Sequence, residues 1–181
     1  MTSGSNSWEE LLFDSSRQTA DMAVNHIGSN PELFNKLVDF ALLDRGQFAM
    51  RAARVMNLLT LQYPHLIRPH LKMLIWKLPE IKNDGLKRGI AKTLTERSVD
   101  YDEETMSVLV DCCFGWLHDP QEKVALKYYA MDILYKITLQ YPELENELIN
   151  TIELHIPEAS SAIKGRGEKI LKKLQKRNLP S

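Results

Sequence analysis

Apolar residues recur every three to four positions along most of the chain, the spacing of one face of an α-helix. Short polar segments interrupt this pattern, and several begin with a residue that caps helices. No segment alternates apolar and polar residues long enough to predict a strand. The pattern therefore predicts helices over residues 8–27, 31–43, 47–62, 64–78, 85–98, 102–117, 121–140, 142–156 and 159–177.

The helix starts carry recognisable signals. Ser7-Trp8-Glu9-Glu10 has the form of a capping box, and Asp119-Pro120-Gln121-Glu122 follows the same logic. Asn30 followed by Pro31 provides an N-cap and a first helical residue. Pro64 and Pro142 are expected to open further helices, and Asn83-Asp84-Gly85 to form a turn between two helices.

One segment of the sequence recurs at a fixed interval. Leu61-Gln62-Tyr63-Pro64 returns as Leu139-Gln140-Tyr141-Pro142, 78 residues later. The match extends without gaps over about thirty positions, with Pro79-Glu80 meeting Pro157-Glu158. An interval of 78 residues is twice a period of about 40, so a further copy is expected between these two.

Each predicted repeat contains a helix with the same core positions. Its first core position, here called the anchor, is occupied by Ser16, Phe48, Leu86, Leu126 and Ile163. Mostly small residues follow four positions later, where a neighbouring helix comes close: Ala20, Ala52, Ile90, Ala130 and Gly167. Eight positions after the anchor stand Val24, Met56, Leu94, Leu134 and Leu171. This register predicts that Leu134 and Leu171 are buried.

These features resemble the HEAT repeat family. Its pattern of an Asp-containing turn, then an apolar residue, a basic residue, two variable residues and alanine is matched by Asp119-Pro120 and Leu126-Lys127-Tyr128-Tyr129-Ala130. The chain also resembles small uncharacterised bacterial HEAT-like proteins. The resemblance implies an all-α, right-handed α-solenoid of about five helix pairs without a sheet. It implies one domain over residues 8–177, a disordered N-terminal segment at 1–7 and a C-terminal tail at 178–181.

Composition narrows the expected partners and compartment. The net charge of the 181 residues is −1, so the whole-molecule charge does not indicate nucleic acid or an anionic membrane. The two cysteines, Cys112 and Cys113, are adjacent and cannot form a useful cross-link. The first residues lack the pattern of a signal peptide, and no apolar run has the length of a membrane helix. These features predict a cytoplasmic protein that does not bind membranes.

A basic and aromatic surface is predicted opposite the core stripe of the anchor helices, on the inner curved face of the solenoid. It consists of Arg51, Arg54, Arg88, Lys92, Tyr128, Asp132, Tyr135 and Lys169. The predicted function is non-enzymatic binding of an acidic protein or peptide segment on this face. Two interpretations stay open, because basic residues in such a ladder also pair with turn acids of neighbouring repeats. A nucleic-acid-binding module is the second candidate function.

The last predicted helix is strongly basic. It carries Lys164, Arg166, Lys169, Lys172, Lys173, Lys176 and Arg177, with Glu168 as its single acid. Such a helix is typical of a solvated end cap, in which cations near the C-terminus interact well with the helix dipole. The alternative is a docking site for an acidic partner.

The sequence offers little that predicts catalysis or a cofactor. Tyr128 and Asp132, one helical turn apart, are similar to the aromatic–aspartate pair in HEAT-like alkylpurine DNA glycosylases, but the tryptophan of that family is missing. Glycosylase activity is therefore the third candidate function. His65 and His70 point to different faces of their helix. The other three histidines, His26, His118 and His155, have no second ligand at a suitable spacing along the chain. No metal site or cofactor is predicted.

Overall fold

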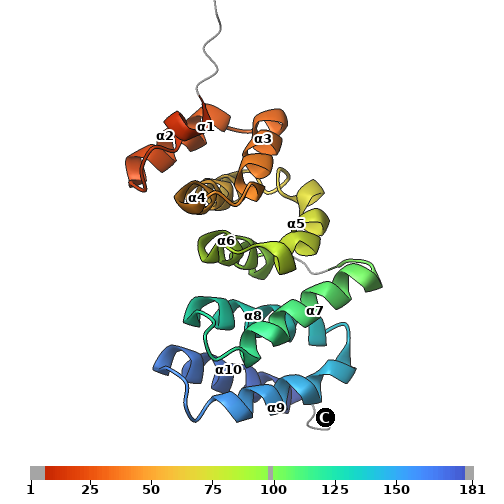
Figure 1. Ribbon diagram of the computed structural model, residues 1–181. Coiled ribbons are helices and arrows are strands. Elements are labelled where there is room, and N and C mark those ends of the chain that lie inside the picture. Colours follow the sequence, from red (N-terminus) through yellow and green to blue (C-terminus); the bar gives the residue numbers. More distant parts are fainter. Residues whose placement is uncertain (1–6, 98–99, 178–181) are drawn as a thin grey trace, which may run out of the picture. The chain divides into compact units, whose positions relative to one another are not determined.

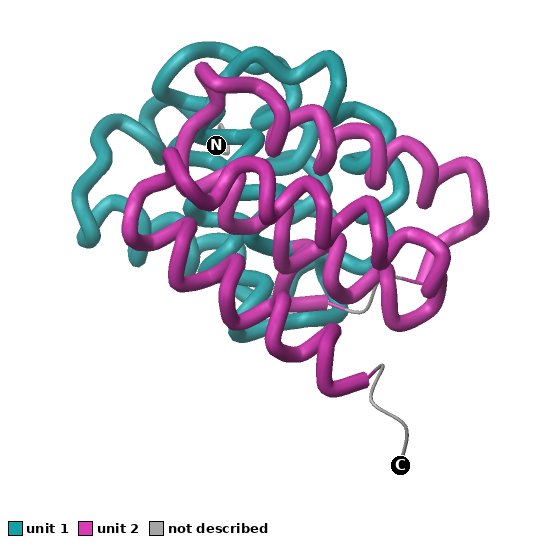
Figure 2. The backbone as a smooth tube through the Cα atoms, turned by 90° about the horizontal axis from the view of Figure 1, so that it is seen from below, with its two compact units in different colours: residues 1–93 teal, residues 94–181 magenta. Residues whose placement is uncertain are grey.

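The computed structural model describes residues 7–97 and 100–177, in which helices are joined by turns and short loops and no strand occurs. The expected all-α class is confirmed. The termini of the predicted organisation, residues 1–6 and 178–181, lie outside the described residues. The chain divides into two compact units, residues 1–93 and 94–181 (Figure 2). None of the helices described is long and apolar enough to cross a membrane.

The first unit consists of short and long helices joined by tight turns (Figure 1). These elements are α1 (Trp8–Leu11), α2 (Arg17–Ile27), α3 (Pro31–Leu42), α4 (Gly46–Gln62), the 3-10 turn η1 (Arg68–His70), α5 (Leu71–Lys77), the 3-10 turn η2 (Leu78–Glu80) and α6 (Asp84–Thr95), whose last two residues belong to the second unit. Helix α4 packs against both α2 and α3.

The second unit contains four long helices and one 3-10 turn. They are α7 (Glu103–His118), α8 (Val124–Thr138), η3 (Pro142–Leu144), α9 (Glu145–His155) and α10 (Ser161–Arg177). Helix α8 packs on α7 and on α10, while α9 packs on α7, α8 and α10. Two layers result, with α7 and α9 in one and α8 and α10 in the other (Figure 1).

Several predicted helix starts are confirmed. The capping box at Ser7 and Glu10 is present. Asn30 accepts hydrogen bonds from the backbone N–H groups of Glu32 and Leu33, and Pro31 follows it as the first residue of α3. Asp102 caps α7 by accepting from the backbone N–H of Thr105. These side chains satisfy amides that the first helical turn leaves without partners.

The expected helix over 8–27 is wrong, because the chain leaves the helix after Leu11 and starts α2 at Arg17. Asp14 accepts a hydrogen bond from the backbone N–H of Ser16, and the Ser16 hydroxyl accepts from that of Thr19. Ser16 is therefore the N-cap of α2 and is exposed, not a core anchor. Short polar side chains bond to nearby backbone and compete with helix continuation.

Other helices also begin later than predicted; α9 begins at Glu145, because Pro142 opens the 3-10 turn Pro142–Leu144 and not the α-helix. Pro64 does not open an α-helix; the α-helical part begins at Leu71. Pro69 has no N–H and its ring would collide with the preceding helical turn, which confines this stretch to a turn. Likewise α8 begins at Val124 and not at residue 121, since Asp119 accepts from the backbone N–H of Gln121 and holds a local turn.

The core register is confirmed in most repeats. The anchors Leu86, Leu126 and Ile163 are buried, as are the small residues Ala20, Ala52 and Ala130. Leu134 is buried with 1% of its surface exposed. The prediction for Leu171 is wrong, because this side chain is half-buried and its neighbours Ile170 and Leu174 fill the core. The core stripe of α10 is thus narrower than that of α8, which buries the same four positions and also Met131, Leu134 and Thr138.

Candidate functional site

The eight residues predicted to form a binding face fall into two groups of four. Arg51, Arg54, Arg88 and Lys92 belong to the first unit, and Tyr128, Asp132, Tyr135 and Lys169 belong to the second. Each group is described within its own unit.

In the first unit, Arg51 and Arg54 of α4 hold the loop between α1 and α2. Arg51 donates to the carbonyls of Leu12 at 3.0 Å and Phe13 at 2.8 Å, and to the side chains of Ser15 and Gln47. Arg54 donates to the Ser15 carbonyl at 2.6 Å. These carbonyls are freed where the helix breaks after Leu11, so both arginines stabilise the fold locally.

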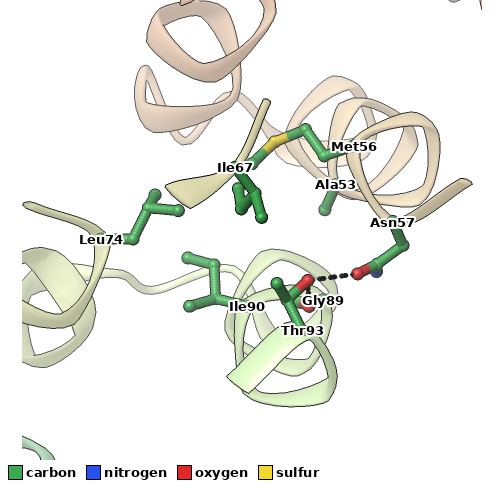
Figure 3. A pocket seen from close by; sticks show the side chains of 8 residues that line it. All are labelled: Ala53, Met56, Asn57, Ile67, Leu74, Gly89, Ile90 and Thr93. Carbon is green, nitrogen blue, oxygen red and sulfur yellow. Dashed lines mark hydrogen bonds between the residues drawn. The ribbon is translucent and has the colours of Figure 1, made fainter. Parts of the chain in front are cut away.

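Arg88 is exposed and Lys92 half-buried on α6, which approaches α4 closely. A Cβ added to Gly89 would stand 2.8 Å from that of Ala53, so only glycine fits there without a shift. The Thr93 hydroxyl donates to Asn57 at 2.6 Å across the same contact (Figure 3). The small pocket beside it has room for about one water molecule, too little for a ligand.

In the second unit, Tyr128 and Asp132 of α8 come together with Arg166 of α10. Both Nε and Nη2 of Arg166 face the carboxylate of Asp132, and the guanidinium lies 5.2 Å from the centre of the Tyr128 ring. Burial raises the pKa of Asp132, and the pairing with Arg166 offsets part of this rise. Asp132 is therefore engaged by a cation and is not an open carboxylate between aromatic rings.

Lys136, one turn further along α8, acts as a structural cation. Its ammonium group donates to the carbonyls of Thr95, the last residue of α6, and of Arg97, two residues further on. Arg177 does the same at the end of α8, where it pairs with the buried Glu145 at 2.9 Å and approaches the Thr138 carbonyl at 3.5 Å. A cation at a helix C-terminus satisfies carbonyls that have no partner within the helix.

The remaining basic residues of α10 point outward. Lys169, Lys172, Lys173 and Lys176, here called the lysine stripe, are all exposed. Their spacing places them within about 100° on one side of the helix. The Lys173 ammonium lies 4.9 Å from the centre of the half-buried Tyr135 ring. Within the described structure, no hydrogen bond or ion pair involves the side chains of the other three stripe residues.

The structure brings together two histidines that sequence reasoning treated as isolated. Nε2 of His155, the last residue of α9, lies 3.2 Å from Nδ1 of His118, the last residue of α7. The two positions are 37 residues apart, close to one repeat, and both end the second helix of a pair. That shared register was the signal available in the sequence. No group of three or more potential metal ligands occurs among the described residues.

The cysteines offer no nucleophile. Burial raises the pKa of the Cys112 thiol to about 11 and that of Cys113 well above its usual range. Both side chains are free thiols, and Cys113 is fully buried in α7. Because the thiolate is the reactive form, these groups serve packing at neutral pH.

Comparison with known proteins agrees with the helical repeat. No curated protein and no solved structure matches this chain. A family model described as a HEAT repeat domain matches residues 8–174, which include nearly every helix of both units. The chain therefore belongs to the HEAT repeat family.

Proposed function

We propose that this protein is a non-catalytic scaffold that binds an acidic segment of a partner protein along the α8–α10 face of its second unit. HEAT repeats are helical scaffolds that commonly bind other proteins. The observation that carries the proposal is the exposed lysine stripe, whose Lys173 lies over the half-buried Tyr135 ring, while Arg166 of the same helix lies over the half-buried Tyr128 ring. We place the protein in the cytoplasm, because its adjacent free cysteines fit a reducing compartment.

The charge around the stripe is strongly segregated. Residues 161–177 contain seven Lys or Arg and one Glu, whereas residues 96–158 contain four Lys or Arg and fourteen Asp or Glu. Arg166 and Arg177 have acidic partners, Asp132 and Glu145, within the fold. Packing therefore accounts for these two arginines but not for Lys169, Lys172 and Lys176, which stay in solvent. A helix end cap does not require four exposed lysines on one side.

The same charge distribution favours a protein segment over nucleic acid. The second unit as a whole has an excess of acids, so it repels the long phosphate backbone of a duplex. A short acidic peptide contacts the stripe alone and avoids the acidic helices. Tyrosine rings, which are enriched at protein interfaces, supply apolar contact beside the lysines.

Two features of α4 and α8 count against the other candidate surfaces. In the first unit, Arg51 and Arg54 already donate to loop carbonyls. Of the residues predicted there to contact a partner, Arg88 and Lys92 then remain. A glycosylase would need Asp132 to act as a general base. In this structure the carboxylate that would accept the proton is paired with the Arg166 cation instead. The glycosylase candidate therefore has no support in this geometry.

A binding assay with defined probes tests the proposal. The probes are a fluorescein-labelled oligoglutamate peptide and a labelled DNA duplex, each titrated at low and high salt. Lys169→Glu/Lys172→Glu/Lys176→Glu reverses the exposed stripe, while Lys36→Glu/Lys82→Glu/Lys123→Glu changes net charge equally at exposed residues elsewhere. We expect the stripe variant to bind the peptide at least about tenfold more weakly at low salt, and the control to bind as the parent does.

Three results would overturn the proposal. Equal peptide binding by parent and stripe variant would remove α10 as the site. Loss of peptide binding in Arg88→Glu/Lys92→Glu but not in the stripe variant would move the site to α6. Tighter binding of the duplex than of the peptide, abolished in the stripe variant, would favour the nucleic-acid function over the one proposed.

A further inference from the structure

The ends of α7 and α9 bring two imidazole rings together outside the proposed binding face. His118 is exposed and His155 half-buried, and Nδ1 of the first lies 3.2 Å from Nε2 of the second. The ring centres are 5.3 Å apart and the rings lie edge to face, at 64°. Phe114, one turn before His118, stacks on the His118 ring with the ring centres 6.5 Å apart.

We propose that His118 and His155 form a binding site for a divalent transition-metal ion, with Nδ1 of His118 and Nε2 of His155 as its two protein ligands. Imidazole nitrogens bind such ions at about 2.0–2.1 Å, so two of them on a tetrahedral ion stand about 3.3 Å apart. The observed separation of 3.2 Å matches this spacing without a movement of either helix. In the metal-free protein the two nitrogens share one proton, and the ion displaces that proton on binding.

The surroundings admit a cation. Both histidines stand at helix C-termini, where the carbonyl groups carry partial negative charge. The negative charge of Glu158, in the turn after α9, favours a positive charge at His155, whereas the positive charge of Lys127 in α8 disfavours it. Since the described residues hold no third ligand in place, water completes the coordination. Nitrogen ligands select Cu²⁺, Ni²⁺ or Zn²⁺ over the oxygen-seeking Mg²⁺ and Ca²⁺.

An ion at this position would link corresponding helices of two successive repeats. His118 ends the second helix of one pair and His155 that of the next, and α7 and α9 pack directly on each other. A ligand that binds the folded unit and not the unfolded chain raises the melting temperature. Metal binding is thus expected to stabilise the second unit without contact to the lysine stripe.

The test uses tag-free protein and Ni²⁺ or Zn²⁺ alone. Binding is followed by calorimetry, and side-chain NMR of the five histidines identifies the ligands. His118→Asn/His155→Gln keeps amide nitrogen and oxygen atoms near the two ring positions and removes the imidazoles. His26→Asn, an exposed histidine on α2, is the matched control. We expect one ion per chain, binding at least about tenfold weaker in the double variant, and the parent affinity in His26→Asn.

The NMR readout keeps the test decisive even if the double variant unfolds, because it is performed on the parent protein. Selective shifts of His118 and His155 with the first equivalent of metal support the site, as does weaker binding at lower pH from proton competition. Shifts spread over all five histidines, or equal affinity in folded double variant and parent, would show that the pair is only a hydrogen bond between two rings.

Discussion

Arg51 in the first unit and Arg166 in the second stand at the same place in their repeats, three residues after the anchors Phe48 and Ile163. Both side chains reach back by about one repeat. Arg51 meets neutral carbonyls of the loop after α1, whereas Arg166 meets the carboxylate of Asp132. The repeat register thus sets how far a long basic side chain reaches, and the group it meets decides whether its charge is neutralised.

The same contrast extends to the neighbouring position, six residues after the anchor. Arg54 occupies it in α4 and donates to the Ser15 carbonyl, while Asp132 occupies it in α8 and accepts from Arg166. In α10 this position is Lys169, which is exposed. Of these three side chains, only that of Lys169 makes no hydrogen bond or ion pair in the described structure, which supports the surface proposed on the second unit.

The largest effect is expected from truncating the core position that both units share. Met56→Ala in α4 and Leu134→Ala in α8 each remove a side chain that is at most 4% exposed. Each should lower the free energy of unfolding by about 2–5 kcal/mol, measured by urea denaturation. Leu171→Ala, in the same slot of α10 but half-buried, is the control and should cost less. An unchanged midpoint for Leu134→Ala would show that the common register is wrong.

An intermediate effect is expected from the two arginines. A double-mutant cycle of Asp132→Ala and Arg166→Ala should give a coupling energy of about 1–2 kcal/mol that shrinks as salt is added, because both partners are charged. Arg51→Ala should cost about 1–3 kcal/mol, mainly from lost hydrogen bonds to neutral carbonyls. The charge of Arg51 also acts on Asp14, so this loss should depend on salt, but less than the loss of the Asp132–Arg166 pair. If both losses responded equally to salt, the distinction between the two arginines would fail.

The smallest effect concerns acid sensitivity in both units. Burial lowers the pKa of His70 in the first unit, against an opposing effect of Asp39, and it also lowers the pKa of His155 in the second. Below the ordinary value of 6.5 the unfolded chain therefore binds protons more readily than the folded one, so stability falls as the pH falls through this range. Above pH 6.5 no stability is lost in this way, because these rings are neutral in both the folded and the unfolded chain.

Melting temperatures at about pH 7.5 and about pH 5.5, recorded with a chelator, check this expectation. His70→Gln and His155→Gln should each show a smaller drop between the two pH values than the parent does. His26→Gln, with its ring in solvent, should show the drop of the parent. A larger drop in His70→Gln or His155→Gln than in the parent would show that the predicted direction of the pH effect is wrong.

Much of the fold could be predicted because its signals are local. Asn30-Pro31 and the Ser7 capping box marked true helix starts, and the register correctly placed Leu86, Leu126 and Leu134 in the core. The errors arose where a polar side chain or a proline overrode the apolar period. The apolar period puts Ser16 at an anchor position although its hydroxyl caps α2, and Pro69 delays the helix expected from Pro64.

The candidate site was less predictable, because its chemistry depends on groups far apart in the chain. Spacing placed Arg51 and Asp132 on the face opposite the core stripe and Arg166 on the basic last helix, but it identified no specific partner for any of them. His118 and His155 appeared isolated for the same reason. Their contact follows from the packing of α7 on α9, which brings residues 37 positions apart to within 3.2 Å.

The sequence by itself determined the helical class, the repeat of about 40 residues and most of the core, because apolar periodicity and capping act within one helical turn. Only the tertiary structure decided which charges stay in solvent. Arginine side chains are long enough to reach the preceding repeat, so Arg51, Arg54 and Arg166 are used within the fold. Lys169, Lys172 and Lys176 point away from the neighbouring helix, and tertiary packing leaves their charges in solvent.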